Sequence, residues 1–119
     1  MSQNAVPHDE LDQLQRVVEG LIQGEQVFAV YDCTGADTGF VGVTNLRVIV
    51  QDNSFLGGKV AVTSLPIRSI TAISFVSDKS LHPATIVIQT GSVVREATFR
   101  GTDKAKHIHD TILWLMTQR

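Results

Sequence analysis

Residues 38–52 read TGFVGVTNLRVIVQD and carry the most informative pattern in the chain. Residues 38–43 and 46–52 are rich in β-branched and apolar side chains, and the pair Thr44-Asn45 separates them. Asparagine tolerates the positive φ angles that two-residue hairpin turns require. The stretch therefore predicts two antiparallel strands joined by a tight turn.

The same period-two alternation continues on both sides of this hairpin. Further strands are predicted at residues 26–33, 59–65, 68–76, 84–90 and 93–100. The first of them should place Val27, Ala29 and Tyr31 on one face of a sheet. Phe28 and Val30 should lie on the opposite face.

Loops are predicted at residues 34–37, 53–58, 77–83 and 91–92, where Gly, Asp, Asn and Ser gather. Pro66 separates two predicted strands, because proline cannot donate a hydrogen bond to a strand ladder. About seven antiparallel strands with exposed edges must close on themselves or be covered. The pattern is therefore that of a mainly β (α+β) fold, with a bent barrel as the expected architecture.

A helix is predicted at residues 9–22, after a flexible N-terminus at residues 1–8. Its apolar side chains fall on one arc: Leu11, Leu14, Val17, Val18, Leu21 and Ile22. Such a stripe has to be covered. The surface that covers it is either the outer face of the last helix around Trp114 or a neighbouring subunit.

A second helix is predicted at residues 102–117. Its apolar face holds five residues: Ala105, Ile108, Ile112, Leu115 and Met116. We expect this face to close one open end of the barrel. Trp114 does not belong to it. The indole lies about 180° around the helix, among the polar residues Asp103, His107 and Asp110.

Four stretches together resemble the bacterial pleckstrin-homology-like (PH-like) family. They are Gly-Glu-Gln-Val at 24–27, residues 38–49 with their Thr-Asn-x-Arg pattern, Phe-Arg-Gly at 99–101, and the last helix with Trp114. The resemblance extends over about residues 20–117. It implies a bent antiparallel barrel of about seven strands capped by the C-terminal helix, to which the helix at 9–22 is an addition. It also implies a small cytosolic module without established chemistry, in a family whose members tend to self-associate.

Composition limits the functions that are open to the chain. It has 119 residues, of which 43% are hydrophobic and 18% charged, which suits one domain with one main core. The net charge of −2 disfavours binding to nucleic acid. The single cysteine excludes an intramolecular disulfide. Acidic residues precede the first basic residue, Arg16, and no apolar run approaches the roughly 20 residues that span a bilayer, so we expect a cytoplasmic protein.

Phosphoinositide binding of the kind that many eukaryotic PH domains show is not expected. That function uses several Lys and Arg side chains around the first strand–turn–strand, and residues 30–38 contain none. Asp32 and Asp37 lie there instead, so the region lacks the positive charge that a phosphate group requires. The resemblance implies the fold without this function.

The sequence contains no recognisable catalytic or metal-binding pattern, and no cofactor is expected. His107 and His109 are two positions apart on the predicted helix, about 200° around it, and cannot bind one ion. Cys33 follows Asp32 with no cation nearby, so we expect a small structural residue at a strand end. Arg47 is expected to pair across the sheet with a carboxylate such as Asp32, with anchorage of a partner as the alternative.

These observations favour a non-catalytic interaction module that self-assembles and binds a protein partner. The candidate interface consists of the exposed tryptophan and part of the N-terminal stripe: Trp114, Leu14, Val18 and Leu21. The alternative is a module that binds a small ligand or a membrane surface at the barrel mouth or a sheet edge.

Overall fold

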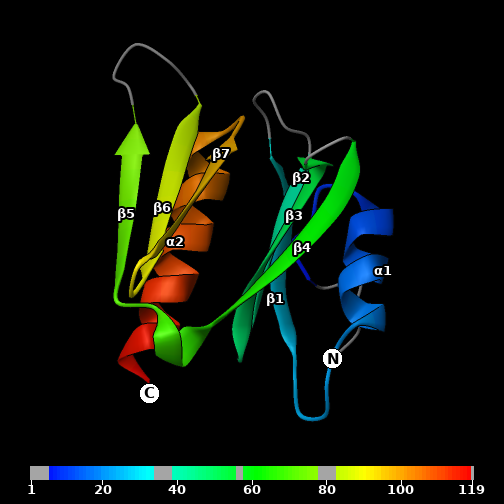
Figure 1. Ribbon diagram of the computed structural model, residues 1–119, viewed down its shortest axis with the longest axis horizontal. Coiled ribbons are helices and arrows are strands. Elements are labelled where there is room, and N and C mark those ends of the chain that lie inside the picture. Colours follow the sequence, from blue (N-terminus) through cyan, green and yellow to red (C-terminus); the bar gives the residue numbers. More distant parts are fainter. Residues whose placement is uncertain (1–5, 34–38, 56–57, 78–82, 119) are drawn as a thin grey trace.

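The computed structural model describes residues 6–33, 39–55, 58–77 and 83–118, and Figure 1 shows how its elements are arranged. The helices are α1 (Leu11–Glu19), the short 3-10 helix η2 (Ile67–Ser69) and α2 (Thr102–Thr117). The strands are β1 (Val27–Cys33), β2 (Gly39–Thr44), β3 (Arg47–Phe55), β4 (Lys59–Pro66), β5 (Ala72–Ser77), β6 (Ala84–Thr90) and β7 (Val93–Phe99). Two antiparallel sheets result, in the orders β1-β2-β3-β4 and β5-β6-β7.

The decisive hairpin forms as predicted, but its turn closes in a different way. Val43 pairs with Val48 across the two strands, and no described non-glycine residue has a positive φ angle. Asn45 therefore does not use the left-handed conformation. Instead, the Thr44 hydroxyl accepts hydrogen bonds from the backbone N–H groups of Leu46 and Arg47, at 3.1 and 3.0 Å. A side chain closes this turn in place of left-handed backbone.

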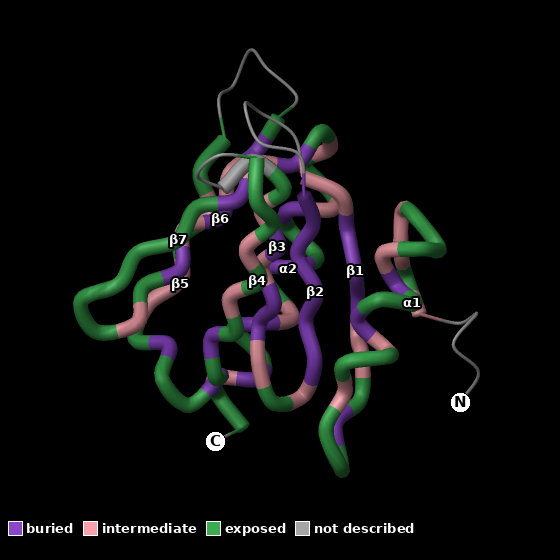
Figure 2. The backbone as a smooth tube through the Cα atoms, turned by 45° about the vertical axis from the view of Figure 1, so that its right-hand side comes forward, coloured by how far each residue is buried: buried purple, intermediate pink, exposed green. Residues whose placement is uncertain are grey.

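The main core lies between the two sheets, and α2 covers it as the sequence predicts. Both sheets turn alternate side chains toward this core, which appears as the buried stretches in Figure 2. From α2 the core receives Ala105, Ile108, Ile112 and Leu115, all of them buried. This confirms the fold expected from the alternation pattern, which is a bent β structure covered at one end by the C-terminal helix.

Helix α1 covers a second, smaller core on the outer face of the four-stranded sheet. Leu14 and Val17 are buried there against Val30, Phe40 and Ile49 of the first three strands. Figure 1 shows α1 and α2 on opposite sides of this sheet. The middle of the stripe is thus covered within the chain, although by the sheet and not by the face of α2 around Trp114, whereas Leu11 and Ile22 at its two ends are exposed.

A single glycine makes room for α1 on the sheet. A Cβ atom added to Gly42 would lie 3.2 Å from Cγ2 of Val17, closer than such atoms usually approach. Val17 therefore occupies the space that a side chain at position 42 would fill. This close approach fixes where the helix sits on β2.

The predicted faces of β1 are wrong at its first two residues. Val27 pairs with Thr44 and Ala29 pairs with Val43, so Phe28 is an extra residue in a β-bulge. Beyond the bulge, Ala29 and Tyr31 face the main core as predicted. Before it the faces exchange, so that Phe28 packs on the main core and Val27 on the smaller one.

Other boundaries shift by small amounts. Helix α1 ends before the predicted 9–22 because the chain leaves the helix at Gly20. Strand β5 begins at Ala72 and not at 68, because the chain forms η2 directly after Pro66. Strand β3 continues to Phe55, into the loop predicted at 53–58. The loop predicted at 34–37, and most of the one at 77–83, lie outside the described residues.

Candidate functional site

A buried ion pair links the N-terminal part of the chain to the β2–β3 turn. Arg47 donates from Nε to Glu25 Oε2 at 2.8 Å and from Nη2 to Glu25 Oε1 at 3.1 Å. The Glu25 side chain is 0% exposed, whereas that of Arg47 is 22% exposed. This two-bond geometry is the strong form of an arginine–carboxylate pair. We call it the Glu25–Arg47 clamp.

Four further hydrogen bonds of the clamp tie segments of the chain together. The Thr44 hydroxyl donates to Glu25 Oε2 at 2.6 Å, and the Ile22 N–H donates to Oε1 at 3.0 Å. Arg47 also donates to the Gly20 carbonyl and to the Ser64 hydroxyl, both at 2.9 Å. The clamp therefore connects the end of α1, the start of β1, the β2–β3 turn and β4.

The clamp also determines the charge state of Glu25. Burial by itself would raise the pKa of this carboxyl group, because it disfavours the charged form. The hydrogen bonds from Arg47, Thr44 and the Ile22 N–H outweigh burial and hold the pKa below its ordinary value. Glu25 is therefore an anion in the folded protein at neutral pH.

The partner expected for Arg47 is corrected by this geometry. Arg47 binds Glu25, and not Asp32 across the sheet. Asp32 lies instead beside Arg100 (3.5 Å), and it accepts a hydrogen bond from the Gln13 amide at 2.9 Å. Glu25 lies in the link between α1 and β1, next to the β2–β3 turn that carries Arg47. Asp32 lies toward the other end of β1, so it is Glu25 that pairs with Arg47.

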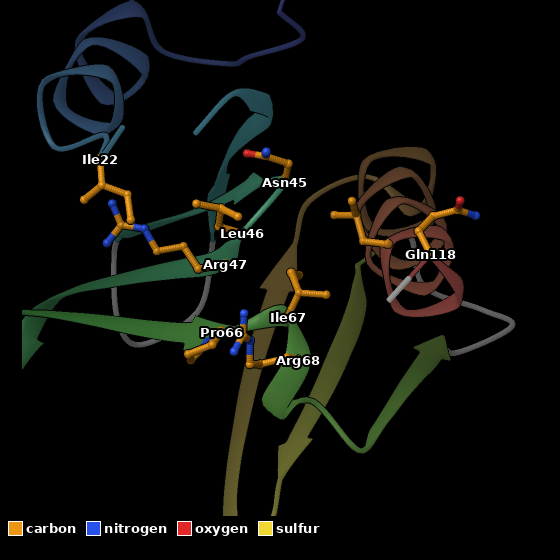
Figure 3. Close-up of a pocket in the computed structure, with 9 residues that line it drawn as sticks. Ile22, Asn45, Leu46, Arg47, Pro66, Ile67, Arg68 and Gln118 are labelled. Carbon is orange, nitrogen blue, oxygen red and sulfur yellow. The ribbon is translucent and has the colours of Figure 1, made fainter. Parts of the chain in front are cut away.

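A hollow of about 420 Å³ opens next to the clamp, at the corner where β4 continues through η2 toward β5. Figure 3 shows side chains reaching it from the β2–β3 turn, the β4–η2 corner and the end of α2. Its walls are mostly apolar, with two arginines at the rim: Ile22, Leu46, Ile67, Leu115, Arg47 and Arg68. We call it the corner hollow. Its lining residues were not recognised in the sequence, because they belong to four segments that meet only in the fold.

Trp114 lies on the surface, as the helical spacing predicts. It is 55% exposed and borders a shallow groove of about 410 Å³ together with Phe28, Pro7, His107 and Asp110. We call this the Trp114 groove. It joins the outer side of α2 to the N-terminal segment and β1, and it combines aromatic surface with polar groups at its edge.

The other three candidate interface residues lie elsewhere. Leu14 is only 1% exposed, so the chain itself covers it. Val18 and Leu21 are half-buried and pack against the smaller core. The structure thus separates the four residues into an exposed tryptophan on α2 and a stripe that mainly holds α1 to its own sheet.

A cluster of charges holds the segment before α1 in place. Asp9 accepts a hydrogen bond from the backbone N–H of Asp32 at 2.8 Å and forms an ion pair with Lys104 of α2. The Pro7 carbonyl accepts a hydrogen bond from the Val30 N–H at 3.1 Å. These contacts hold residues 7–9 along β1.

The surroundings of Cys33, His107 and His109 bear on whether these residues act as a nucleophile or as metal ligands. Burial, together with the nearby Asp32 and Asp9 carboxylates, raises the pKa of the Cys33 thiol to about 12, so the thiol is protonated at neutral pH. His109 packs edge-on against Phe75, with ring centres 6.1 Å apart. His107 shares a 2.7 Å hydrogen bond with the Tyr31 hydroxyl. Among the described residues, no three His, Cys, Asp or Glu side chains converge as metal ligands would.

Two further expectations concern membranes. In the described part of the chain, no helix is long and apolar enough to cross a bilayer. Strands β1 and β2 contain no Lys or Arg. Asp37, in the turn between them, lies outside the described residues.

Comparison with known proteins identifies the fold. No protein family and no curated protein matches this chain. The structure is similar to the crystal structure of a pleckstrin homology domain from Shewanella amazonensis SB2B, with a TM-score of 0.67 and 22% sequence identity over 95% of this chain and 92% of that one. It is also similar to a DUF1696 family protein with a pleckstrin-homology domain from Shewanella loihica PV-4, with a TM-score of 0.62 and 21% identity over 91% and 94% of the two chains. The chain therefore has a PH-like fold, as the four sequence stretches predict.

Proposed function

We propose that this chain is a non-catalytic interaction module that associates with copies of itself and presents a second surface to another protein. The PH-like fold supports an interaction role in general. Two surface features support the particular role: the free edge of the four-stranded sheet and the Trp114 groove.

The free edge of β4 is the observation that carries self-association. Among the described strands, β4 pairs only with β3, so its other edge offers backbone N–H and C=O groups for pairing. Val60 and Val62 stand on this edge with 54% and 60% of their surface exposed. Val62 projects from the outer face of the sheet, because it pairs with Gln51, which alternates onto the same face as Ile49 of the smaller core; Val60, two residues away, lies on the same face. An apolar strand edge of this kind is a template for a second copy.

The Trp114 groove supports the second surface. A large aromatic side chain that is more than half exposed gains from burial against a partner, and tryptophan is enriched among residues that dominate binding energy. Phe28 and Pro7 extend the apolar surface beside it. The groove lies on α2, β1 and the N-terminal segment, so both surfaces can be used independently of each other.

Light scattering after size exclusion tests self-association. At micromolar concentration we expect a mass above that of one chain, and we expect Val62→Lys to reduce it to the monomer, because a lysine on a strand edge opposes pairing. Val94→Lys is the matched control, since Val94 is also an exposed valine but lies on β7 of the other sheet. A monomeric wild type, or an equal effect of both substitutions, would remove the support from the β4 edge.

The alternative of a membrane-surface module calls for a separate measurement. Sedimentation with anionic liposomes at low and high salt should show no binding, because β1 and β2 carry no basic residue. Binding that is lost at high salt would favour the alternative over the interaction module.

A further inference from the structure

The corner hollow has an uneven distribution of charge. Its apolar wall comes from Ile22, Leu46, Ile67 and Leu115, whereas its rim carries Arg47 and Arg68. None of the described residues that line it is a carboxylate. Glu25 lies behind Arg47, where it is fully buried and engaged in the clamp. A molecule in the hollow therefore meets apolar surface and positive charge.

Arg68 supplies a free cation at this rim. The residue is exposed on η2, and within the described part of the chain it forms no ion pair or hydrogen bond. A guanidinium group without a partner can form two parallel hydrogen bonds with one carboxylate. Arg68 is thus the group best placed to bind an anionic head.

Arg47 adds one further donor. Its Nε and both hydrogens of Nη2 are used by Glu25 and the Gly20 carbonyl, and one hydrogen of Nη1 is used by Ser64. Since a guanidinium group has five N–H donors, one N–H on Nη1 remains. Its charge is balanced by Glu25, so Arg47 contributes a hydrogen bond and Arg68 the net charge.

The geometry points to the corner hollow as a binding site for a small amphipathic carboxylate, in which an unbranched apolar chain ends in one carboxylate group. The carboxylate binds Arg68 at the rim, and the chain covers the exposed Ile22 and Leu46, beneath which Ile67 and Leu115 are buried. The volume of about 420 Å³ lies within the range of small-molecule pockets. This site is distinct from the β4 edge and the Trp114 groove, so it does not depend on self-association.

The site can be tested by titrating the full chain with decanoate, acetate and decyltrimethylammonium while its amide NMR signals are monitored. Decanoate below its micelle concentration should bind saturably and shift the signals of residues 46, 67, 68 and 115. Acetate has the head without the chain, and decyltrimethylammonium has the chain with the opposite charge. Both should bind at least about tenfold more weakly, as expected when a charged hydrogen bond or the apolar contact is lost.

Two substitutions distinguish this site from general detergent-like binding. Arg68→Gln should weaken decanoate about tenfold, whereas it should not weaken decyltrimethylammonium, because loss of the positive charge removes repulsion of the cation. Arg95→Gln is the control, because Arg95 is also exposed and lies on β7, away from the hollow. Equal binding of the two ten-carbon ions, shifts that map elsewhere, or an undiminished affinity of Arg68→Gln would each overturn the proposal.

Discussion

Arg47 holds Glu25 with two parallel hydrogen bonds, of 2.8 and 3.1 Å, although 22 positions separate the two residues in the chain. The pair stands where α1 ends and the barrel begins. Its further bonds to the Gly20 carbonyl and the Ser64 hydroxyl reach the helix on one side and β4 on the other. The ion pair therefore contributes to the attachment of the N-terminal segment, together with the packing of α1 on the sheet and the contacts of Asp9.

Removal of the charge on Glu25 should destabilise the protein strongly. Glu25→Gln keeps the size of the side chain but leaves Arg47 without its anion. Breaking one side of a buried pair costs about 3–5 kcal/mol, and we expect about 3 kcal/mol because Arg47 is partly exposed. Urea unfolding at pH 7 measures the change. Asp110→Asn breaks the exposed pair with Lys106 and should cost at most about 0.5 kcal/mol. A similar loss of unfolding free energy in both variants would show that the clamp stabilises the fold no more than an exposed ion pair does.

The clamp should also make stability depend on acidity. The folded state lowers the pKa of Glu25 below its ordinary value of 4.5. A group of this kind stabilises the fold fully above its unfolded pKa, and the contribution is lost as the pH falls through the folded pKa. The difference in unfolding free energy between wild type and Glu25→Gln should therefore be constant above pH 4.5 and shrink below it. Other carboxyl groups cancel in this difference. A difference that stays constant down to pH 3 would contradict the prediction.

The strands of the barrel and the helix α2 that covers it could be predicted, because each leaves a periodic signal in the sequence. Strands alternate with period two, and the buried face of α2 repeats with the period of a helix. The partner of Arg47 leaves no such signal. Glu25 and Asp32 are both carboxylates near the ends of the first strand, and only the path of the chain after Gly20 decides which of them meets the arginine.

The same reasoning explains the errors in β1 and α1. A bulge of one residue exchanges the faces of Val27 and Phe28, yet both residues are apolar on either face, so the alternation does not reveal it. The apolar stripe of α1 shows that the helix must be covered but not by what. Its location follows from Gly42, and a glycine within a strand is only a weak sign that another chain segment comes close.

Gly42 should therefore be intolerant of a branched side chain. Gly42→Val places methyl groups where Val17 now packs, and overpacking of this kind costs about 1–3 kcal/mol. Hydrogen exchange should become faster in residues 11–19 and remain slow in the barrel strands, because only the smaller core is disturbed. Gly20→Ala is the control, since its added carbon would make ordinary contacts at 3.7 Å. Unchanged exchange in α1 of Gly42→Val would show that this close approach does not hold the helix.

Cys33 should be unreactive in the folded protein. Burial and the neighbouring carboxylates raise the pKa of its thiol to about 12, so only a very small fraction is thiolate at pH 8. We expect a disulfide reagent such as Ellman's reagent to label native protein slowly and urea-unfolded protein rapidly. Because the chain has one cysteine, the released chromophore reports this site alone. Fast labelling of the native protein would contradict the raised pKa of the Cys33 thiol.

Trp114 offers a direct readout of its own surroundings, since it is the only tryptophan of the chain. Its side chain is 55% exposed, so Trp114→Ala should lower the free energy of unfolding by less than about 1 kcal/mol. If the Trp114 groove binds a protein partner, the partner should protect the indole from quenching by iodide. Val62→Lys should leave this protection intact, because Val62 lies on β4 of the sheet and not beside the groove. Loss of several kcal/mol in Trp114→Ala would mean that the tryptophan supports the fold, and its exposure would then have no bearing on partners.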